Sequence, residues 1–219
     1  MNTFKMIMTG ICFTGVSGAA LAQTQSTTLG DLINSSGTIS SGDKLFSDFT
    51  YLGTGDVPAA DDINVVAITD NLGNFGLRFQ GAFMDLPGNA GSDALITYKI
   101  TVTDPDFAIT GARMQGNPDV LGGGNSFAGV TDTFLPQVTD QNLAIFDNDD
   151  ILQLDSSVFF DGAFTELDVQ KDIILFTDDD SVATTLSFVD QTYYQVPEPT
   201  SLALLGIGSL LIARRRRDR

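Results

Sequence analysis

The sequence contains no histidine and no tryptophan, and its single cysteine is Cys12. Without histidine, the chain cannot build a Ser-His-Asp or Cys-His catalytic centre, and it lacks the usual ligand of zinc and copper sites. The absence of tryptophan weakens the case for a platform that stacks on sugars, although tyrosine and phenylalanine can also serve. A single cysteine excludes an internal disulfide, so core burial, with or without a bound metal ion, has to stabilise the fold.

Basic residues are scarce away from the two ends of the chain. Of the eleven lysines and arginines, Lys5 and the arginines after position 213 lie at the ends. The stretch between them holds only Lys44, Arg78, Lys99, Arg113 and Lys171. With 28 acidic residues, the formal net charge is -17. Such a surface repels phosphate backbones, so we expect no nucleic-acid partner, whereas cations and polar glycans are compatible with it.

The N-terminal segment has the three parts of a secretory signal peptide. Lys5 supplies positive charge, the stretch 6–16 is mostly apolar, and the small residues Ala20 and Ala22 follow. This order predicts that signal peptidase removes residues 1–22 and leaves Gln23 as the first residue. The alternative is an ordinary buried N-terminal helix. A lipoprotein is excluded, because Cys12 does not follow a small residue.

The C-terminal segment also has three parts. Pro197, Glu198 and Pro199 precede an uncharged run over 202–213, and the run ends at four arginines, which are Arg214, Arg215, Arg216 and Arg217. As a helix, this run reaches roughly 18 Å, well short of the ~30 Å hydrocarbon core. We therefore predict a short C-terminal transmembrane helix that holds the chain transiently, with the arginines on the cytoplasmic side.

These three parts, in this order over residues 196–219, resemble the PEP-CTERM sorting signal of bacteria with a Gram-negative type of envelope. The resemblance implies cleavage near Pro-Glu-Pro by an exosortase, followed by release or by transfer to a surface acceptor. It also implies an association with exopolysaccharide and biofilm matrix. The alternative is a plain C-terminal membrane anchor with a basic flank.

Residues 23–195 between these signals are expected to form one all-β ectodomain. In "ITYKITVT" the apolar residues alternate with polar ones, which is typical of a half-buried strand. "NFGLRFQGAF" has the same period, and we also expect "LQLDSSVFF" to be one strand that buries Leu152, Leu154, Val158 and Phe160. "TTLGDLI" permits a short helix around residues 28–33. About nine or ten strands joined by Gly, Asn, Asp and Pro turns favour an antiparallel β-sandwich, jelly-roll-like, flanked by the signal helix and the C-terminal transmembrane helix.

Aspartates gather at several turns of this body. Asp147, Asp149 and Asp150 form the best candidate for a Ca²⁺ site, because hard oxygen ligands at turns suit this ion. The spacing does not match an EF-hand, since Ile151 falls where a ligand is needed. The alternative is that aspartate favours turns and keeps an exposed protein soluble. The other acidic turns contain Asp61 and Asp62, Asp104 and Asp106, and Asp178 to Asp180.

No residue pattern predicts catalysis. A glycosidase needs two carboxylates with different pKa values, but in so acidic a chain a suitable pair arises by chance. Tyr193 and Tyr194 can stack on sugars or belong to the fold near a stalk. We therefore expect an exported, non-enzymatic surface or matrix protein with a structural or adhesive role beside polysaccharide. A Ca²⁺-dependent carbohydrate-binding module is the alternative, followed by a surface hydrolase. We expect signal peptidase and an exosortase to process the protein, and the membrane to hold its C-terminal segment transiently.

Overall fold

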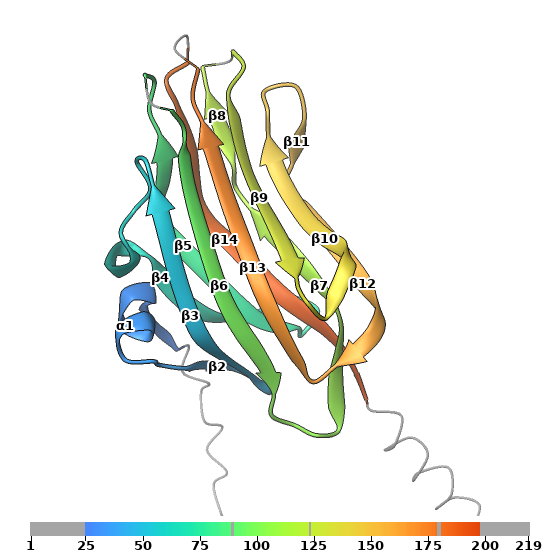
Figure 1. The fold of residues 1–219 in the computed structure, drawn as a ribbon. Helices are drawn as coiled ribbons and strands as arrows, with labels where there is room; N and C mark the ends of the chain where they lie inside the picture. Colours follow the sequence, from blue (N-terminus) through green and yellow to red (C-terminus); the bar gives the residue numbers. More distant parts are fainter. Residues whose placement is uncertain (1–24, 89, 123, 179–180, 198–219) are drawn as a thin grey trace, which may run out of the picture.

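The computed structural model describes residues 25–88, 90–122, 124–178 and 181–197. They form two seven-stranded antiparallel sheets that pack face to face, so the predicted antiparallel β-sandwich is confirmed (Figure 1). The predicted signal peptide and the predicted C-terminal transmembrane helix lie outside the described residues. Among the helices that are described, none has both the length and the apolar character needed to cross a membrane.

The first sheet, called sheet A, has the strand order β1-β4-β5-β14-β7-β12, and β8 pairs with β14. Its strands are β1 (Ser26–Thr28), β4 (Asn64–Thr69), β5 (Phe75–Asp85), β14 (Ala183–Pro197), β7 (Phe107–Gly116), β12 (Asp155–Phe164) and β8 (Asp119–Leu121). The long strand β14 therefore lies in the middle of this sheet, between β5 and β7.

The second sheet, called sheet B, has the order β11-β10-β9-β13-β6-β3-β2. Its strands are β11 (Leu152–Gln153), β10 (Val138–Asp147), β9 (Phe127–Phe134), β13 (Glu166–Phe176), β6 (Ser92–Val102), β3 (Lys44–Thr54) and β2 (Ile39–Ser41). The sequence predicted about nine or ten strands, whereas the described residues form fourteen. Strands of two or three residues carry no readable alternation.

The short helix predicted around residues 28–33 is confirmed as α1 (Leu29–Asn34). Thr28 caps it, because its hydroxyl accepts a hydrogen bond from the Asp31 backbone N–H at 3.0 Å. A single 3₁₀ turn, η1 (Ala60–Asp62), precedes β4. Leu29 and Leu32 of α1 are buried, so this helix extends the core at the edge of the sandwich.

The alternation predicted for β6 is confirmed, since Ile96, Tyr98, Ile100 and Val102 all point into the core. The prediction of one strand over "LQLDSSVFF" is wrong. Leu152 belongs to β11 of sheet B, whereas β12 of sheet A begins only at Asp155. Leu152 and Leu154 are exposed, because the chain crosses between the two sheets here and the alternation is interrupted.

The core also contains a buried ion pair on the inner face of sheet B. Lys171 of β13 lies opposite Asp132 of β9, and its ammonium donates to the two carboxylate oxygens at 2.7 and 2.8 Å. The same ammonium reaches Gln191 Oε1 of sheet A at 3.2 Å. Burial lowers the pKa of Lys171 and raises the pKa of Asp132. Both side chains are fully buried, so each charge depends on the other.

Candidate functional site

An open groove of about 350 Å³ lies on the outer face of sheet A, where β4, β5, β14 and β7 run side by side. Strand register assembles it from distant parts of the chain. Asp190 of β14 lies between Arg78 of β5 and Gln115 of β7, and its neighbour Thr192 lies opposite Arg113. These residues alternate with the core residues Val189 and Tyr193 along β14, so they point away from the sandwich interior.

Two carboxylates hold the arginines of the groove. Arg78 donates from Nε and Nη2 to the two carboxylate oxygens of Asp190, at 2.6 and 2.8 Å. Arg113 donates from Nε to both oxygens of Asp155 at 3.1 Å, and from Nη2 to Oδ2. These hydrogen bonds raise the pKa of both arginines, so the two guanidinium groups are charged and fixed in orientation.

Aromatic rings lie beside the polar residues at both ends. The Arg78 guanidinium lies 4.5 Å from the centre of the Phe188 ring. Towards the other end, Phe159 of β12 and Tyr194 of β14 stack at 4.9 Å between ring centres, with 18° between their planes. Phe159 is 68% exposed. The outer face of β14 therefore carries, in order along the strand, Phe188, Asp190, Thr192 and Tyr194.

A glycine allows the two stacked rings to meet. Gly111 of β7 lies between Tyr194 and Phe159 in the register of the three strands. A Cβ at this position would lie 2.4 Å from the Val158 carbonyl oxygen and 2.9 Å from Tyr194 Cδ2. Any side chain here would displace the strand or the tyrosine ring, so Gly111 is required for this stacking.

Asp70 closes the edge of the groove at the turn between β4 and β5. Its carboxylate accepts backbone N–H groups of Leu72 and Asn74 at 2.8 Å, the Asn74 side chain at 2.9 Å and the Thr192 hydroxyl at 3.3 Å. Burial opposes ionisation, but these donors outweigh it and hold the pKa of Asp70 below its ordinary value. The turn is therefore tied directly to β14.

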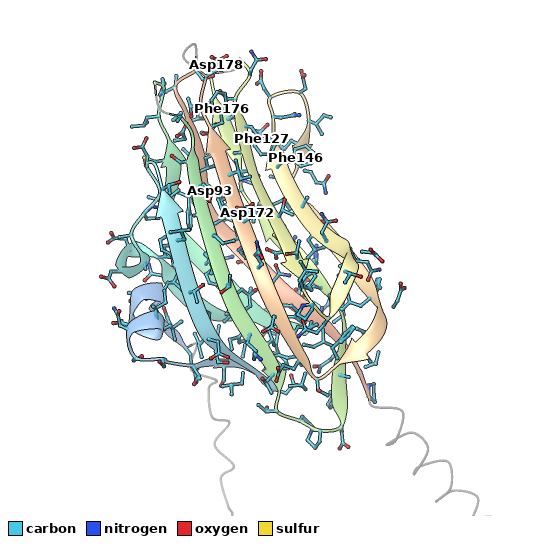
Figure 2. All side chains as sticks on the ribbon, in the orientation of Figure 1. Asp93, Phe127, Phe146, Asp172, Phe176 and Asp178 are labelled. Carbon is cyan, nitrogen blue, oxygen red and sulfur yellow. The ribbon has the colours of Figure 1, made fainter. Side chains whose placement is uncertain are left out.

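The outer face of sheet B has a different chemistry. Phe127, Phe146 and Phe176 project from the neighbouring strands β9, β10 and β13 (Figure 2). The rings of Phe127 and Phe146 stack at 6.3 Å. Asp93 and Asp172 lie further along the same face, and burial together with the negative charge of Asp93 raises the pKa of Asp172. The groove on sheet A includes neither of these carboxylates.

The structure places Asp147 at the end of β10 and Asp149 and Asp150 in the turn that follows. Asp147 Oδ2 accepts the Val120 backbone N–H and Oδ1 accepts the Asp149 backbone N–H, both at 3.0 Å. Asn148 closes the same turn by accepting the Ile151 backbone N–H at 2.7 Å. Asp147 thus links β8 to β10 through hydrogen bonds. Ca²⁺ binding at these three aspartates stays a prediction.

The other acidic turns have local hydrogen bonds as well. Asp104 accepts the Asp106 backbone N–H at 3.0 Å, and Asp178 Oδ2 accepts the Asn125 backbone N–H at 3.2 Å. Asp61 and Asp62 lie in η1. Within the described ranges, no three Asp, Glu, His or Cys side chains gather closely enough to hold a metal ion.

The predicted processing residues lie almost entirely outside the described part of the chain. Ala20, Ala22 and Gln23 precede it, whereas Glu198, Pro199 and Arg214 to Arg217 follow it. Pro197 is described, and it is the last residue of β14, paired with Phe107. The sequence also predicts that "DQTYYQVPEP" carries the last strand into an exposed stalk, but up to Pro197 this segment is still paired with β7.

The side chains of the adjacent residues Tyr193 and Tyr194 lie on opposite faces of sheet A, although the sequence suggested the same role for both. Tyr193 is fully buried in the core, and only Tyr194 faces the groove side of sheet A. The sequence did not single out Arg78, Arg113, Asp190 or Phe159 as site residues. The sequence feature that could have identified them is the scarcity of basic residues between the two ends of the chain, because it makes Arg78 and Arg113 unusual.

Comparison with protein families found a match in the C-terminal segment. Residues 195–217 match the PEP-CTERM protein-sorting motif, so the predicted resemblance is confirmed. The chain thus carries a PEP-CTERM sorting signal at its C-terminus, and PEP-CTERM proteins are exported and sorted to the cell surface. A comparison with curated proteins found no match.

The solved structures that resemble the chain share little sequence identity with it. A xylan-binding module, CBM15, is 12% identical, with 72% of this chain and 97% of that one covered and a TM-score of 0.29. The enzymatically active domain of tailspike protein 4 from bacteriophage CBA120 is 12% identical, at a TM-score of 0.31. The alignment covers 68% of this chain but only 20% of the tailspike chain. At such TM-scores, the likeness says nothing about ligands or activity.

Proposed function

We propose that the protein is a non-enzymatic component of the cell surface or extracellular matrix, with a structural or adhesive role within or against exopolysaccharide. The observation that carries this proposal is the PEP-CTERM motif over residues 195–217. The motif begins at residue 195, within β14, which lies in the middle of sheet A. The sorting signal therefore overlaps the last described strand of the fold.

The route to the surface has three proposed steps. Signal peptidase removes residues 1–22 after export across the inner membrane. The apolar run over 202–213 then holds the chain in the membrane, with the arginines at its cytoplasmic end. An exosortase finally cleaves near Pro197, Glu198 and Pro199. Cleavage after Pro197 would retain every strand that the structure describes in the two sheets.

The contacts that hold the end of β14 support this order of events. Val196 and Pro197 pair with Ala108 and Phe107 of β7. The ammonium of Lys44, from sheet B, contacts the Gln195 side chain. The strand that enters the sorting signal is thus fixed to both sheets. We expect these contacts to keep β14 in place after cleavage and transfer.

A role without catalysis is supported by the chemistry of the outer surface. The chain has no histidine, and each arginine of the sheet A groove is paired with an aspartate. Such fixed polar groups suit binding and positioning better than proton transfer, which needs a group that changes its charge. A Ca²⁺-dependent carbohydrate-binding module is the second candidate, and a surface hydrolase is the third.

Mass spectrometry of the protein recovered from the bacterium that produces it tests the proposal. We expect a first residue of Gln23 and a chain that has lost the four consecutive arginines. Cell fractionation should find this form at the surface or in the matrix. Recovery of an intact, folded precursor in the cytoplasm, with its arginines still attached, would overturn the proposal.

A further inference from the structure

We propose that the groove on the outer face of sheet A binds a neutral polysaccharide chain, with Phe159 and Tyr194 as the stacking platform and Arg78 and Arg113 as hydrogen-bond donors. The proposal deepens the proposed function and rests on it, because it identifies the surface that would face exopolysaccharide.

The distribution of cations singles out this groove. The stretch between the two end segments has five basic residues, and Lys44 and Lys171 are fully buried among them. Of the three that reach the surface, Arg78 and Arg113 both line the groove, whereas Lys99 lies on sheet B. In a chain of net charge -17, two partly exposed arginines in one groove form a distinct local chemistry.

The arginines retain donors for a ligand. Each guanidinium has five N–H groups, and the hydrogen bonds to Asp190 and Asp155 use those on Nε and Nη2. No hydrogen bond links either Nη1 to another residue of the described ranges. Because the aspartates fix the planes of both guanidinium groups, little side-chain entropy is lost when these donors bind hydroxyls.

The arrangement of aromatic and polar groups fits a carbohydrate. A sugar ring presents a face of C–H groups, which stacks on an aromatic ring, and a rim of hydroxyls, which both donate and accept hydrogen bonds. Phe159 and Tyr194 offer the ring surface, while Gln115, Thr192 and the arginines offer the polar partners. Along β14, Phe188 and Tyr194 are about 20 Å apart, since an antiparallel strand rises about 3.4 Å per residue. This length suits a polymer rather than a single sugar.

Charge decides in favour of a neutral polymer. Asp190 and Asp155 balance the two arginines, and Asp70 adds one negative charge at the edge of the groove. The rest of the body is strongly acidic and repels polyanions. An acidic polysaccharide would be repelled by these charges and would find no unpaired cation to bind among the described residues of the groove. A neutral polysaccharide is not repelled.

Affinity electrophoresis in native gels tests the proposal with the purified protein. The gels contain hydroxyethyl cellulose, dextran or galactomannan as neutral probes, and alginate or polygalacturonate as acidic ones. Gels with exopolysaccharide from the producing bacterium are run before and after chemical reduction of its carboxyl groups. We expect retardation in at least one neutral gel and none in acidic gels.

Four variants locate the binding surface. Phe159→Ala and Arg113→Gln should each weaken binding about ten-fold, as loss of an anchor residue does. The matched controls on sheet B, Phe146→Ala and Lys99→Gln, should bind as the wild type does. Melting curves exclude unfolding, and Phe159 is exposed enough to be replaced safely.

Three outcomes would overturn the proposal. They are no retardation in any neutral gel, retardation in acidic gels only, and loss of binding in the sheet B controls rather than in the groove variants. None of them affects the sorting proposal, which the processed mass and the surface location test separately.

Discussion

The hydroxyl groups of Tyr98 in β6 and Tyr193 in β14 lie 2.8 Å apart in the middle of the core. The two residues are 2% and 0% exposed, and they come from opposite sheets. Burial raises the pKa of both phenols, so neither ionises at neutral pH. Their hydrogen bond satisfies two buried polar groups at once and joins the two sheets within the core.

Replacing one of these tyrosines should therefore cost more than replacing both. Tyr193→Phe leaves the Tyr98 hydroxyl buried without this partner, which should lower the free energy of unfolding by about 1–3 kcal/mol. The double variant Tyr98→Phe, Tyr193→Phe should recover most of this loss. Urea unfolding of the wild type and the three variants measures the coupling. A double variant that loses the sum of the two single effects would show that the hydroxyls act independently.

The ion pair of Lys171 and Asp132 should behave in a similar way, with larger energies. Asp132→Leu leaves a buried ammonium without its counter-charge and should cost about 3–5 kcal/mol. Asp132→Leu combined with Lys171→Met removes both charges and should be close to neutral or stabilising. Chemical denaturation provides the measurement. If the combined variant is as unstable as Asp132→Leu alone, packing rather than charge explains the loss.

Asp172 predicts a pH dependence of stability. Its pKa is raised in the folded state, so the folded protein binds the proton more tightly than the unfolded chain does. Stability therefore falls as the pH rises from the ordinary pKa of an aspartate to the raised pKa of Asp172. Asp172→Asn removes this penalty. The variant should melt at a higher temperature than the wild type at pH 7 and at the same temperature near pH 3. A variant that melts below the wild type at pH 7 would contradict the assigned cause.

Asp147 distinguishes a hydrogen-bonded turn from a Ca²⁺ site. Its carboxylate accepts backbone N–H groups of Val120 and Asp149, so Asp147→Ala should cost about 1–3 kcal/mol even in the presence of EDTA. If the turn also binds Ca²⁺, added calcium should raise the melting temperature of the wild type but not of the variant. An unchanged wild-type melt across millimolar calcium would refute the calcium prediction, while the cost of the substitution should remain.

Much of the fold could be predicted because a half-buried strand shows its burial in its own sequence. The alternation of β6 predicted every one of its inward residues from Ile96 to Val102. The same rule failed at Leu152 and Leu154, where the chain leaves sheet B for sheet A, because alternation identifies a strand but not the sheet to which it belongs. It also could not identify β14 as a central strand.

The candidate site was out of reach for a related reason. Arg78 and Asp190 are 112 positions apart, and Arg113 and Asp155 are 42 apart. Nothing local links the members of either pair. The sequence also presented Tyr193 and Tyr194 as equivalent, although one lies in the core and the other on the surface.

The sequence by itself determined the all-β class, the acidic surface and the sorting signal, because alternation, charge and a short linear motif are read within a few neighbouring residues. The tertiary structure alone decided that two of the three partly exposed cations of the sandwich share one groove. Strand order and register arise from the packing of two sheets against each other, and this packing depends on residues far apart in the chain.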